Sequence, residues 1–407
     1  MGMHLNAYTS REQTVYFAKC FKHDVGVAMD ILSDILLHSS LAPKAVENER
    51  GVIVREMEEV AKQHEEVIMD YLHEAAYTNS GLGMTILGPE DNIRGLKQQQ
   101  FRDYIDTHYT APRMVVCGAG AVDHAELVEL AKQYWGQLPV EPRTSYPTNF
   151  DAAVFSGGEK RQFDNTVNEA HISVAFEGTS WTSPEAFPLM LIQSILGNWD
   201  RLSGAGAQVP SPLAQTLAEQ DLVHSFNTLN ISYKDTGLFG KWLIALARSR
   251  PVGSVQSGHS PLLPIVNCFF APLCLSLDPS GIYIIGDQDK MADALSATAL
   301  QVQRLGRPGG VSKEVLERAQ TQLKASLMQQ LGTFSYICED LGRQLLTYGR
   351  RMSTGEVFAR IEAVTLEDIQ LCAKRFTDGS QDVAVGALGT IDGVPDYEFI
   401  NGVFLKK

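Results

Sequence analysis

The chain has 407 residues, of which 44% are hydrophobic and 20% charged, a composition typical of soluble proteins and long enough for two domains with separate cores. Its formal net charge of −14 argues against nucleic acid as a partner and favours a basic peptide or a basic subunit surface. The six cysteines show no C-x-x-C spacing and no density typical of a secreted scaffold, so we expect a reducing compartment and no disulfides.

The chain begins with sequence typical of strands. His4–Tyr8 and Thr14–Cys20 flank the polar turn Ser10–Glu12, which predicts a hairpin, and no secretory or arginine-rich transit sequence precedes it. Two explanations stay open: a short hairpin begins the protein, or an upstream portion is missing. A helix is predicted next, at about Val25–Leu37.

The segment Pro43–Tyr77 is predicted to form one long amphipathic helix, because apolar residues recur at helical spacing behind a first-turn proline. Four positions fall seven residues apart: Glu49, Glu56, Gln63 and Asp70. At about 100° per residue they share one face, with Glu66 one turn before the last of them. This face is interpreted either as a solvated acidic surface or as the seat of the chemistry.

Further helices are predicted at Lys97–Tyr109 and Asp123–Trp135, with a strand at Arg113–Gly118 between them. A segment rich in Pro, Thr and Gly then separates two halves. The predicted division is residues 1–137, a linker at residues 138–158, and residues 159–407.

The second half repeats the first at an offset of 268 residues. The matches are Glu49-Arg50 with Glu317-Arg318, Ile93 with Ile361, and the strand at 113–118 with residues 382–386. We therefore expect two related α+β halves. The same offset places Lys324 opposite Glu56, so the repeated helix does not itself require a carboxylate at that position.

Long runs along the chain resemble one known family. These runs are HLNAYTSREQTVYFAK, ERGVIVREMEEV, EEVIMDYLHEAAY, GMTILGPEDNI, THYTAPRMVVCGAGAV, LGNWDRLSGAG and SYICEDLGRQLLTYGRR. They resemble the beta-type subunits of the mitochondrial processing peptidase family, pitrilysin-type zinc endopeptidases with an inverted H-x-x-E-H motif. The resemblance covers nearly the whole chain and is far more specific than a single short motif.

The resemblance implies an α+β fold of two homologous halves, each a mostly antiparallel sheet with helices on one face, which together enclose a cavity. It implies one Zn²⁺ per active subunit, an alpha subunit as heterodimer partner, and arginine-containing presequence peptides as substrates. It also implies a mitochondrial location, in the matrix or, if attached to the cytochrome b–c complex, at the inner membrane.

For catalysis, the resemblance matches Glu56 to the third zinc ligand of the family and Glu49 to a carboxylate that orients the site. The other two ligands and the general base are the residues of H-x-x-E-H. None of the ten histidines begins this motif, and His73, in HEAAY, lacks the second histidine. We expect these residues upstream of Met1. The chain is therefore expected to be catalytically incomplete, with weak or absent zinc binding.

For substrate binding, the resemblance matches Glu66 and Asp70 to an acidic pair that binds the substrate arginine, and Asn6 and Ala7 to an edge strand that binds an extended peptide. The alternatives are an ordinary exposed acidic pair and a plain edge strand. In a straight helix Asp70 would lie about 21 Å from Glu56, whereas two extended residues span only about 7 Å. The helix should therefore bend, or the substrate should run along it.

One segment, Lys241–Ser280, has no counterpart in the family. Its Pro, Ser, Leu, Cys and Phe content favours a translated intron. A membrane anchor at Pro261–Leu277 is the alternative, although this run is short and contains three prolines. We expect a surface loop that the sheet does not need.

Three functions are compatible with the sequence: a processing-peptidase beta subunit acting on presequences with an alpha subunit, a structural core subunit of the cytochrome b–c complex, and a non-catalytic presequence-binding remnant. Glu56, Glu66, Asp70 and the run ILGPEDNI favour the peptidase over a purely structural core. The absence of H-x-x-E-H favours the third function for this chain.

Overall fold

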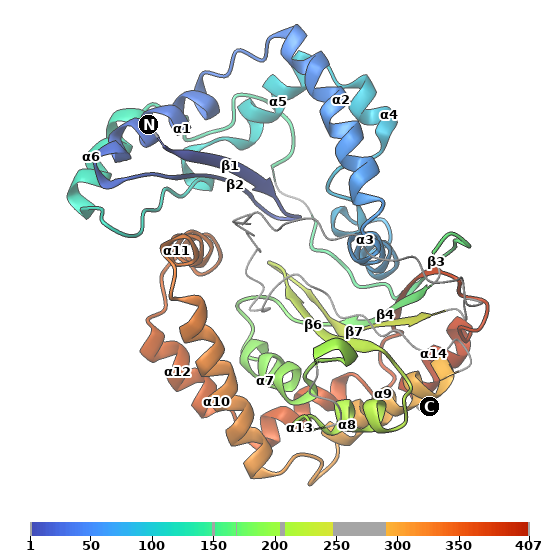
Figure 1. The fold of residues 1–407 in the computed structure, drawn as a ribbon. Helices are drawn as coiled ribbons and strands as arrows, with labels where there is room; N and C mark the ends of the chain where they lie inside the picture. Colours follow the sequence, from blue (N-terminus) through green and yellow to red (C-terminus); the bar gives the residue numbers. More distant parts are fainter. Residues whose placement is uncertain (1, 149–150, 168, 204–207, 247–289, 406–407) are drawn as a thin grey trace, which may run out of the picture.

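The computed structural model describes residues 2–148, 151–167, 169–203, 208–246 and 290–405, which form two bodies of helices and strands facing each other (Figure 1). The first half contains β1 (His4–Thr9), β2 (Thr14–Lys19), α1 (Val25–Leu37), α2 (Pro43–Val60), α3 (His64–Ala76), α4 (Glu90–Gly95), α5 (Gln98–His108) and α6 (His124–Trp135). The second half contains β3 (Gly158–Phe163), β4 (Glu169–Glu177), α7 (Ala186–Leu196), β5 (Trp199–Asp200), α8 (Pro212–Glu219), β6 (Ser225–Ser232), β7 (Gly237–Leu246), α9 (Met291–Leu305), α10 (Lys313–Gln330), α11 (Phe334–Tyr348), α12 (Thr354–Ala363), α13 (Leu366–Arg375), β8 (Ala384–Gly389) and α14 (Tyr397–Phe404). None of the helices in these ranges is both long and apolar enough to cross a membrane.

The predicted hairpin and three of the predicted helices are present in the first half. Strands β1 and β2 pair antiparallel, from His4 opposite Lys19 to Thr9 opposite Thr14. Helix α1 has the predicted bounds, and α5 and α6 begin and end within one residue of theirs. Helix α6 begins where it does because the Asp123 side chain accepts a hydrogen bond from the Glu126 N–H at 3.0 Å, which satisfies a donor in the first turn.

The strand predicted at Arg113–Gly118 is wrong. A short 3₁₀ helix spans Ala111–Arg113, and residues 114–119 follow without joining a ladder. In the described part of the first half only β1 and β2 pair with each other, so this half shows a smaller sheet than the family resemblance implied. A β-branched run becomes a strand only where a neighbouring strand supplies hydrogen bonds, and the run's own residues cannot reveal that neighbour.

The single long helix predicted over Pro43–Tyr77 is broken into α2 and α3, which is one of the two outcomes that the distance argument allowed. Helix α2 ends at Val60, and Gln63 leaves helical geometry with φ −92° and ψ 87°. In Figure 1, α2 lies in the plane of the picture while α3 is seen almost along its axis. The two parts are buried differently, since α2 has no buried residue and α3 has five. The break therefore directs α3 toward the interior of the protein.

Among the described residues, the second half is built on a mixed six-stranded sheet in the order β3-β8-β4-β7-β6-β5, in which only β3 and β8 pair in parallel. Along β4 the residues Ala170, Ile172, Val174 and Phe176 face the core that the helices of this half cover. The intervening Ala175 contributes to a second buried cluster, which also contains Leu72 of α3. The sheet therefore has its own helices on one face and a helix of the first half on the other.

Part of the predicted inserted segment, residues 241–246, is strand rather than the expected loop. Strand β7 continues to Leu246, where its backbone pairs with Glu169 of β4, and it pairs with β6 as far as Leu243. A strand hydrogen-bonded on both sides continues the sheet rather than leaving it as a loop. The remainder of the predicted segment, residues 247–280, lies outside the described residues.

The repeat includes two pairs of consecutive helices, α2–α3 and α10–α11, and the bend within each pair. Helices α2 and α10 each have 18 residues, and a three-residue break separates each from the next helix. These bounds correspond at an offset of 270. A shared contact agrees, because Arg50 donates to the carbonyl of Leu96, after α4, and Gln320 donates to the carbonyl of Val364, after α12, at 3.2 Å.

The predicted match of Glu49-Arg50 with Glu317-Arg318 is therefore displaced by two residues along this helix. Glu56 corresponds to Ser326 rather than to Lys324. Lys324 instead forms an ion pair with Glu362 of α12 at 2.5 Å. Because the residue of α10 equivalent to Glu56 is a serine, the inference that the repeated helix does not require a carboxylate at this position still holds.

The second helix of each pair crosses to the other half. Helix α3 lies so close to β8 that a Cβ on Gly386 would lie 3.0 Å from the carbonyl oxygen of Ile68. Helix α11 contacts the first half, where Cys338 donates to the carbonyl of Cys117 at 3.4 Å and Tyr8 donates to Glu339 at 2.5 Å. Each half therefore supports a helix of the other.

Candidate functional site

The residues predicted for zinc lie on the outer helix α2. Glu49 and Glu56 are both exposed there. Within the ranges that the structure describes, no group of three or more His, Cys, Asp or Glu side chains lies close enough to hold a metal ion. A catalytic zinc site needs three protein ligands, so the described residues do not fit the ion on their own. Glu56 stays a predicted ligand.

His73 is the histidine that comes closest to matching H-x-x-E-H, and it is buried inside the protein. It is 1% exposed, with Nδ1 2.7 Å from the Met69 carbonyl oxygen and Nε2 2.6 Å from the Tyr233 hydroxyl. Burial, and to a lesser degree the Arg11 charge, hold its pKa well below the usual value. The neutral imidazole thus joins α3 to the second half, and both of its nitrogens have partners.

Three carboxyl groups occupy the first two turns of α3: Glu65, Glu66 and Asp70, hereafter the acidic cluster. Asp70 forms an ion pair with Arg11, from the turn between β1 and β2, with 2.5 Å between Nη2 and Oδ1. Arg11 also donates from Nε to the Leu82 carbonyl at 3.1 Å. The Arg11 side chain is 11% exposed and that of Asp70 30%, whereas Glu66 is exposed. The cluster therefore contains one internally paired carboxylate and one that solvent reaches freely.

Burial and mutual repulsion raise the proton affinity of this cluster. Desolvation, followed by the charge of Glu66, raises the pKa of Glu65 to about 7. The pKa of Glu66 is also raised, by desolvation and then by Asp70, while Arg11 acts in the opposite direction. Glu66 is crowded by protein yet open to solvent, a combination expected on a concave surface. An approaching cation lowers both pKa values and is attracted in return.

The hairpin that carries Arg11 is attached to both halves. Glu12, next to Arg11, accepts a hydrogen bond from the Lys234 N–H in the turn between β6 and β7 at 2.7 Å. Tyr8 donates to Glu339 of α11, and the Tyr16 hydroxyl lies 2.9 Å from that of Tyr109, the residue that follows α5. The turn is thereby fixed beside α3.

The predicted peptide-binding edge lies on the same hairpin. Asn6 and Ala7 are exposed on β1, which pairs within the described residues with β2 alone. The Asn6 side chain accepts a hydrogen bond from the Ala7 N–H at 2.8 Å. A peptide that adds to the sheet through this donor has to displace that side chain.

Comparison with known proteins gives two family models and a set of relatives. The model "Insulinase (Peptidase family M16)" matches residues 1–90, and "Peptidase M16 inactive domain" matches residues 95–241. The beta subunit of the mitochondrial-processing peptidase of Lentinula edodes is 38% identical over 400 residues, covering 98% of this chain and 77% of the relative. That of Rattus norvegicus is 39% identical over 400 residues, covering 98% and 73%. The chain belongs to the mitochondrial-processing peptidase beta-subunit family of M16 peptidases.

A solved structure confirms the fold expected for this family. A chain of "Complex III2 from Candida albicans, Inz-5 bound" matches with a TM-score of 0.79 over 99% of this chain and 86% of that one. The identity is 20%, so the match concerns the fold. The two-half α+β architecture predicted from the sequence is thereby confirmed.

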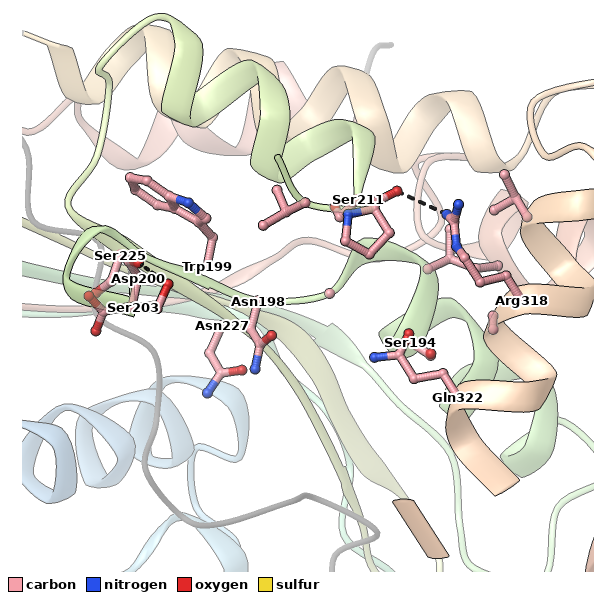
Figure 2. A pocket seen from close by; sticks show the side chains of 16 residues that line it. Ser194, Asn198, Trp199, Asp200, Ser203, Ser211, Ser225, Asn227, Arg318 and Gln322 are labelled. Carbon is pink, nitrogen blue, oxygen red and sulfur yellow. Dashed lines mark hydrogen bonds between the residues drawn. The ribbon is translucent and has the colours of Figure 1, made fainter. Parts of the chain in front are cut away.

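A cavity of about 540 Å³ lies away from the predicted site, between α7, β6 and α10 of the second half (Figure 2). Asn198, Asn227 and Gln322 contribute amide groups to its lining, and Arg318 at its rim donates to the Pro210 carbonyl at 2.9 Å. The Ser225 hydroxyl is buried in the lining, and no partner for it is found among the described residues. Water fits and can satisfy this group. Neither the predicted zinc residues nor the acidic cluster lines this cavity.

The sequence arguments identified two members of the acidic cluster and missed its third member, Glu65, and its cation, Arg11. Glu66 and Asp70 lie together at the predicted one-turn spacing on α3. Arg11 was assigned only to a polar turn, and Glu65 was not singled out. The turn showed a basic residue, but its partner lies 59 residues further along the chain.

Proposed function

We propose that this chain acts as the beta-type subunit of a mitochondrial processing peptidase, located in mitochondria and paired with an alpha subunit, and that it binds arginine-containing presequences of imported proteins. Support comes from relatives so named that align with 98% of the chain. The observation that carries the binding role is the acidic cluster, with Glu66 open to solvent beside the Asp70–Arg11 pair.

The chemistry of the cluster suits a guanidinium. An arginine presents a planar fork of donors, and a charge-assisted hydrogen bond to a carboxylate contributes roughly 1.5–3 kcal/mol. Glu66 supplies the accessible carboxylate, and the Asp70 oxygen not held by Arg11 supplies a second acceptor. The edge at Asn6 and Ala7 then holds the peptide backbone irrespective of its sequence.

Glu56 is proposed as one ligand of the family's zinc ion, with Glu49 orienting it. A bound zinc supplies a Lewis acid that activates water. Because the described residues do not complete its ligand set, no cleavage step is assigned to them. We expect purified residues 1–407 to retain less than one zinc per chain after dialysis, and stoichiometric zinc that is lost in Glu56→Gln would contradict this expectation.

The binding role is tested with residues 1–407 purified together with an alpha subunit. The Kd for a fluorescent presequence peptide is measured by anisotropy, alongside a peptide whose arginine is replaced by glutamine. We expect Glu66→Gln to weaken binding of the arginine peptide roughly tenfold or more, which corresponds to the contribution of a charge-assisted bond. Glu58→Gln, an exposed carboxylate on α2, is the matched control. Equal binding of both peptides by the unmodified chain would refute the proposal.

A second function, as a core subunit of the cytochrome b–c complex, is favoured by the fold similarity to a complex III chain. The two functions differ in where the chain is found. Recovery of the native protein in a detergent-solubilised inner-membrane complex supports the core function, and recovery in a matrix heterodimer supports the peptidase.

A further inference from the structure

We propose that Arg11 is a positioning residue of the presequence site: its guanidinium holds Asp70, and thereby shapes the acidic cluster to accept one arginine from the substrate. This inference rests on the proposed function. It concerns a residue of the hairpin rather than of the helix that carries the acidic pair.

The geometry fixes the Arg11 side chain from two directions. Its Nη2 lies 2.5 Å from Asp70 Oδ1, and its Nε donates to the Leu82 carbonyl at 3.1 Å. The neighbouring Glu12 attaches the same turn to the Lys234 N–H. A guanidinium held by two partners and mostly shielded from solvent is costly to displace. A substrate arginine therefore shares Asp70 with Arg11 instead of replacing it.

The charges around the cluster explain why such a residue is needed. Along α3 the groups are His64, Glu65, Glu66 and Asp70. From the hairpin turn come Arg11 and Glu12, and from the turn between β6 and β7 come Lys234 and Asp235. Without Arg11, three carboxyl groups share two turns of one helix with no cation bound to them, and such groups take up protons more readily. A protonated carboxyl group attracts a guanidinium far less.

The pairing also limits the stoichiometry of the site. Arg11 offsets the charge of Asp70, and Glu65, whose pKa is raised to about 7, can hold a proton. Glu66 is then the one carboxylate that a substrate guanidinium has to balance. The bond between Arg11 and Oδ1 fixes the plane of the Asp70 carboxylate, and this sets the direction in which the other oxygen accepts a hydrogen bond. Arg11 therefore determines both how the second acceptor is oriented and how many cations the site accepts.

The experiment measures presequence binding to the heterodimer formed by an alpha subunit with Arg11→Gln or Arg11→Lys. Each variant is tested with the arginine peptide and the glutamine peptide, at pH 6.5 and pH 8. The matched control is Arg94→Gln, which removes an exposed arginine paired with Glu90 on α4. Melting temperatures establish that each variant is folded.

We expect Arg11→Gln to weaken binding of the arginine peptide about tenfold at pH 6.5 and less at pH 8, where the carboxyl groups ionise without help. The affinity of Arg11→Gln for the glutamine peptide should fall less than twofold. Arg11→Lys keeps the charge but not the fork, so its affinity for the arginine peptide should lie between those of the unmodified chain and Arg11→Gln. Tighter binding by Arg11→Gln would identify Arg11 as a competitor of the substrate and overturn the proposal. An equal loss for both peptides, or at both pH values, would reduce Arg11 to a structural role. If the unmodified chain already fails to distinguish the peptides, the proposed function itself fails.

Discussion

The paired helices α2–α3 and α10–α11 have matching lengths and the same bend, yet they are buried in opposite ways. Helix α10 buries four apolar residues in the core of its own half, whereas α2 buries none among the described residues. After the bend the order reverses, since α3 buries Ile68 and Leu72 completely and α11 buries only Arg343 and Gln344. The acidic cluster is thus held by the second half, and the first half brings Arg11 to it. The site belongs to the interface between the halves.

The largest effect is expected from a substitution that disturbs the packing of α3. Leu72→Ala removes a fully buried side chain at the interface and should lower the free energy of unfolding by about 2–5 kcal/mol. Leu345→Ala on α11, where the side chain is 36% exposed, should cost less than about 1 kcal/mol. Urea unfolding of both variants measures the difference. Equal losses would mean that the two helices are anchored alike.

The next test compares two glycines at equivalent positions of the repeat, Gly386 and Gly118. A Cβ on Gly386 would meet backbone atoms of α3, Ile68 O at 3.0 Å and Leu72 N at 3.1 Å, whereas one on Gly118 would meet the end of the Leu127 side chain at 2.9 Å. Backbone cannot move aside as a side-chain methyl can. Gly386→Ala should therefore cost about 1–3 kcal/mol, and Gly118→Ala less. A larger melting-temperature loss for Gly118→Ala would contradict the close contact between α3 and β8.

The smallest expected effect is a pH dependence carried by His73. Its folded-state pKa lies well below the unfolded value, so the unfolded chain binds the proton and stability falls as the pH drops below about 6.5. The contribution is at most about 1.4 kcal/mol for each pH unit. Urea unfolding between pH 6.5 and 5.5 should show a shallower slope for His73→Asn than for the unmodified chain. An unchanged slope would show that His73 is not the buried titrating group.

Local patterns predicted the local elements. The hairpin, α1, α5 and α6 were correctly placed because turn residues, helical periodicity and the Asp123 cap all lie within a few positions of what they determine. The break at residues 61–63 was inferred only from a distance argument, since neither Lys62 nor Gln63 is a helix breaker. The strand at 113–118 failed because its partner is not local.

The same distinction separates the contacts of the acidic cluster that the sequence could predict from those that it could not. Glu66 and Asp70 share a helix, so their juxtaposition followed from spacing, whereas the Arg11 contact depends on how the hairpin packs against α3, 59 residues further along the chain. The sequence revealed the repeat, but the alignment of Glu49-Arg50 with Glu317-Arg318 gave an offset of 268. The bounds of α2 and α10 correspond at an offset of 270. As site residues, all six stay predictions: Glu49, Glu56, Glu66, Asp70, Asn6 and Ala7.

The hairpin's attachments have a consequence for biogenesis. The β1–β2 segment leaves the ribosome well before its partners, because Tyr8 meets Glu339, 331 residues later in the chain. At about 5–20 residues per second, synthesis of that partner follows after roughly 15–65 s. During this interval the hairpin lacks the partners on α11 and on the turn between β6 and β7 that hold it in the folded protein, and its unpaired edges can promote aggregation. We expect a holding chaperone, or very dilute conditions, to protect the nascent chain until its last third has been made.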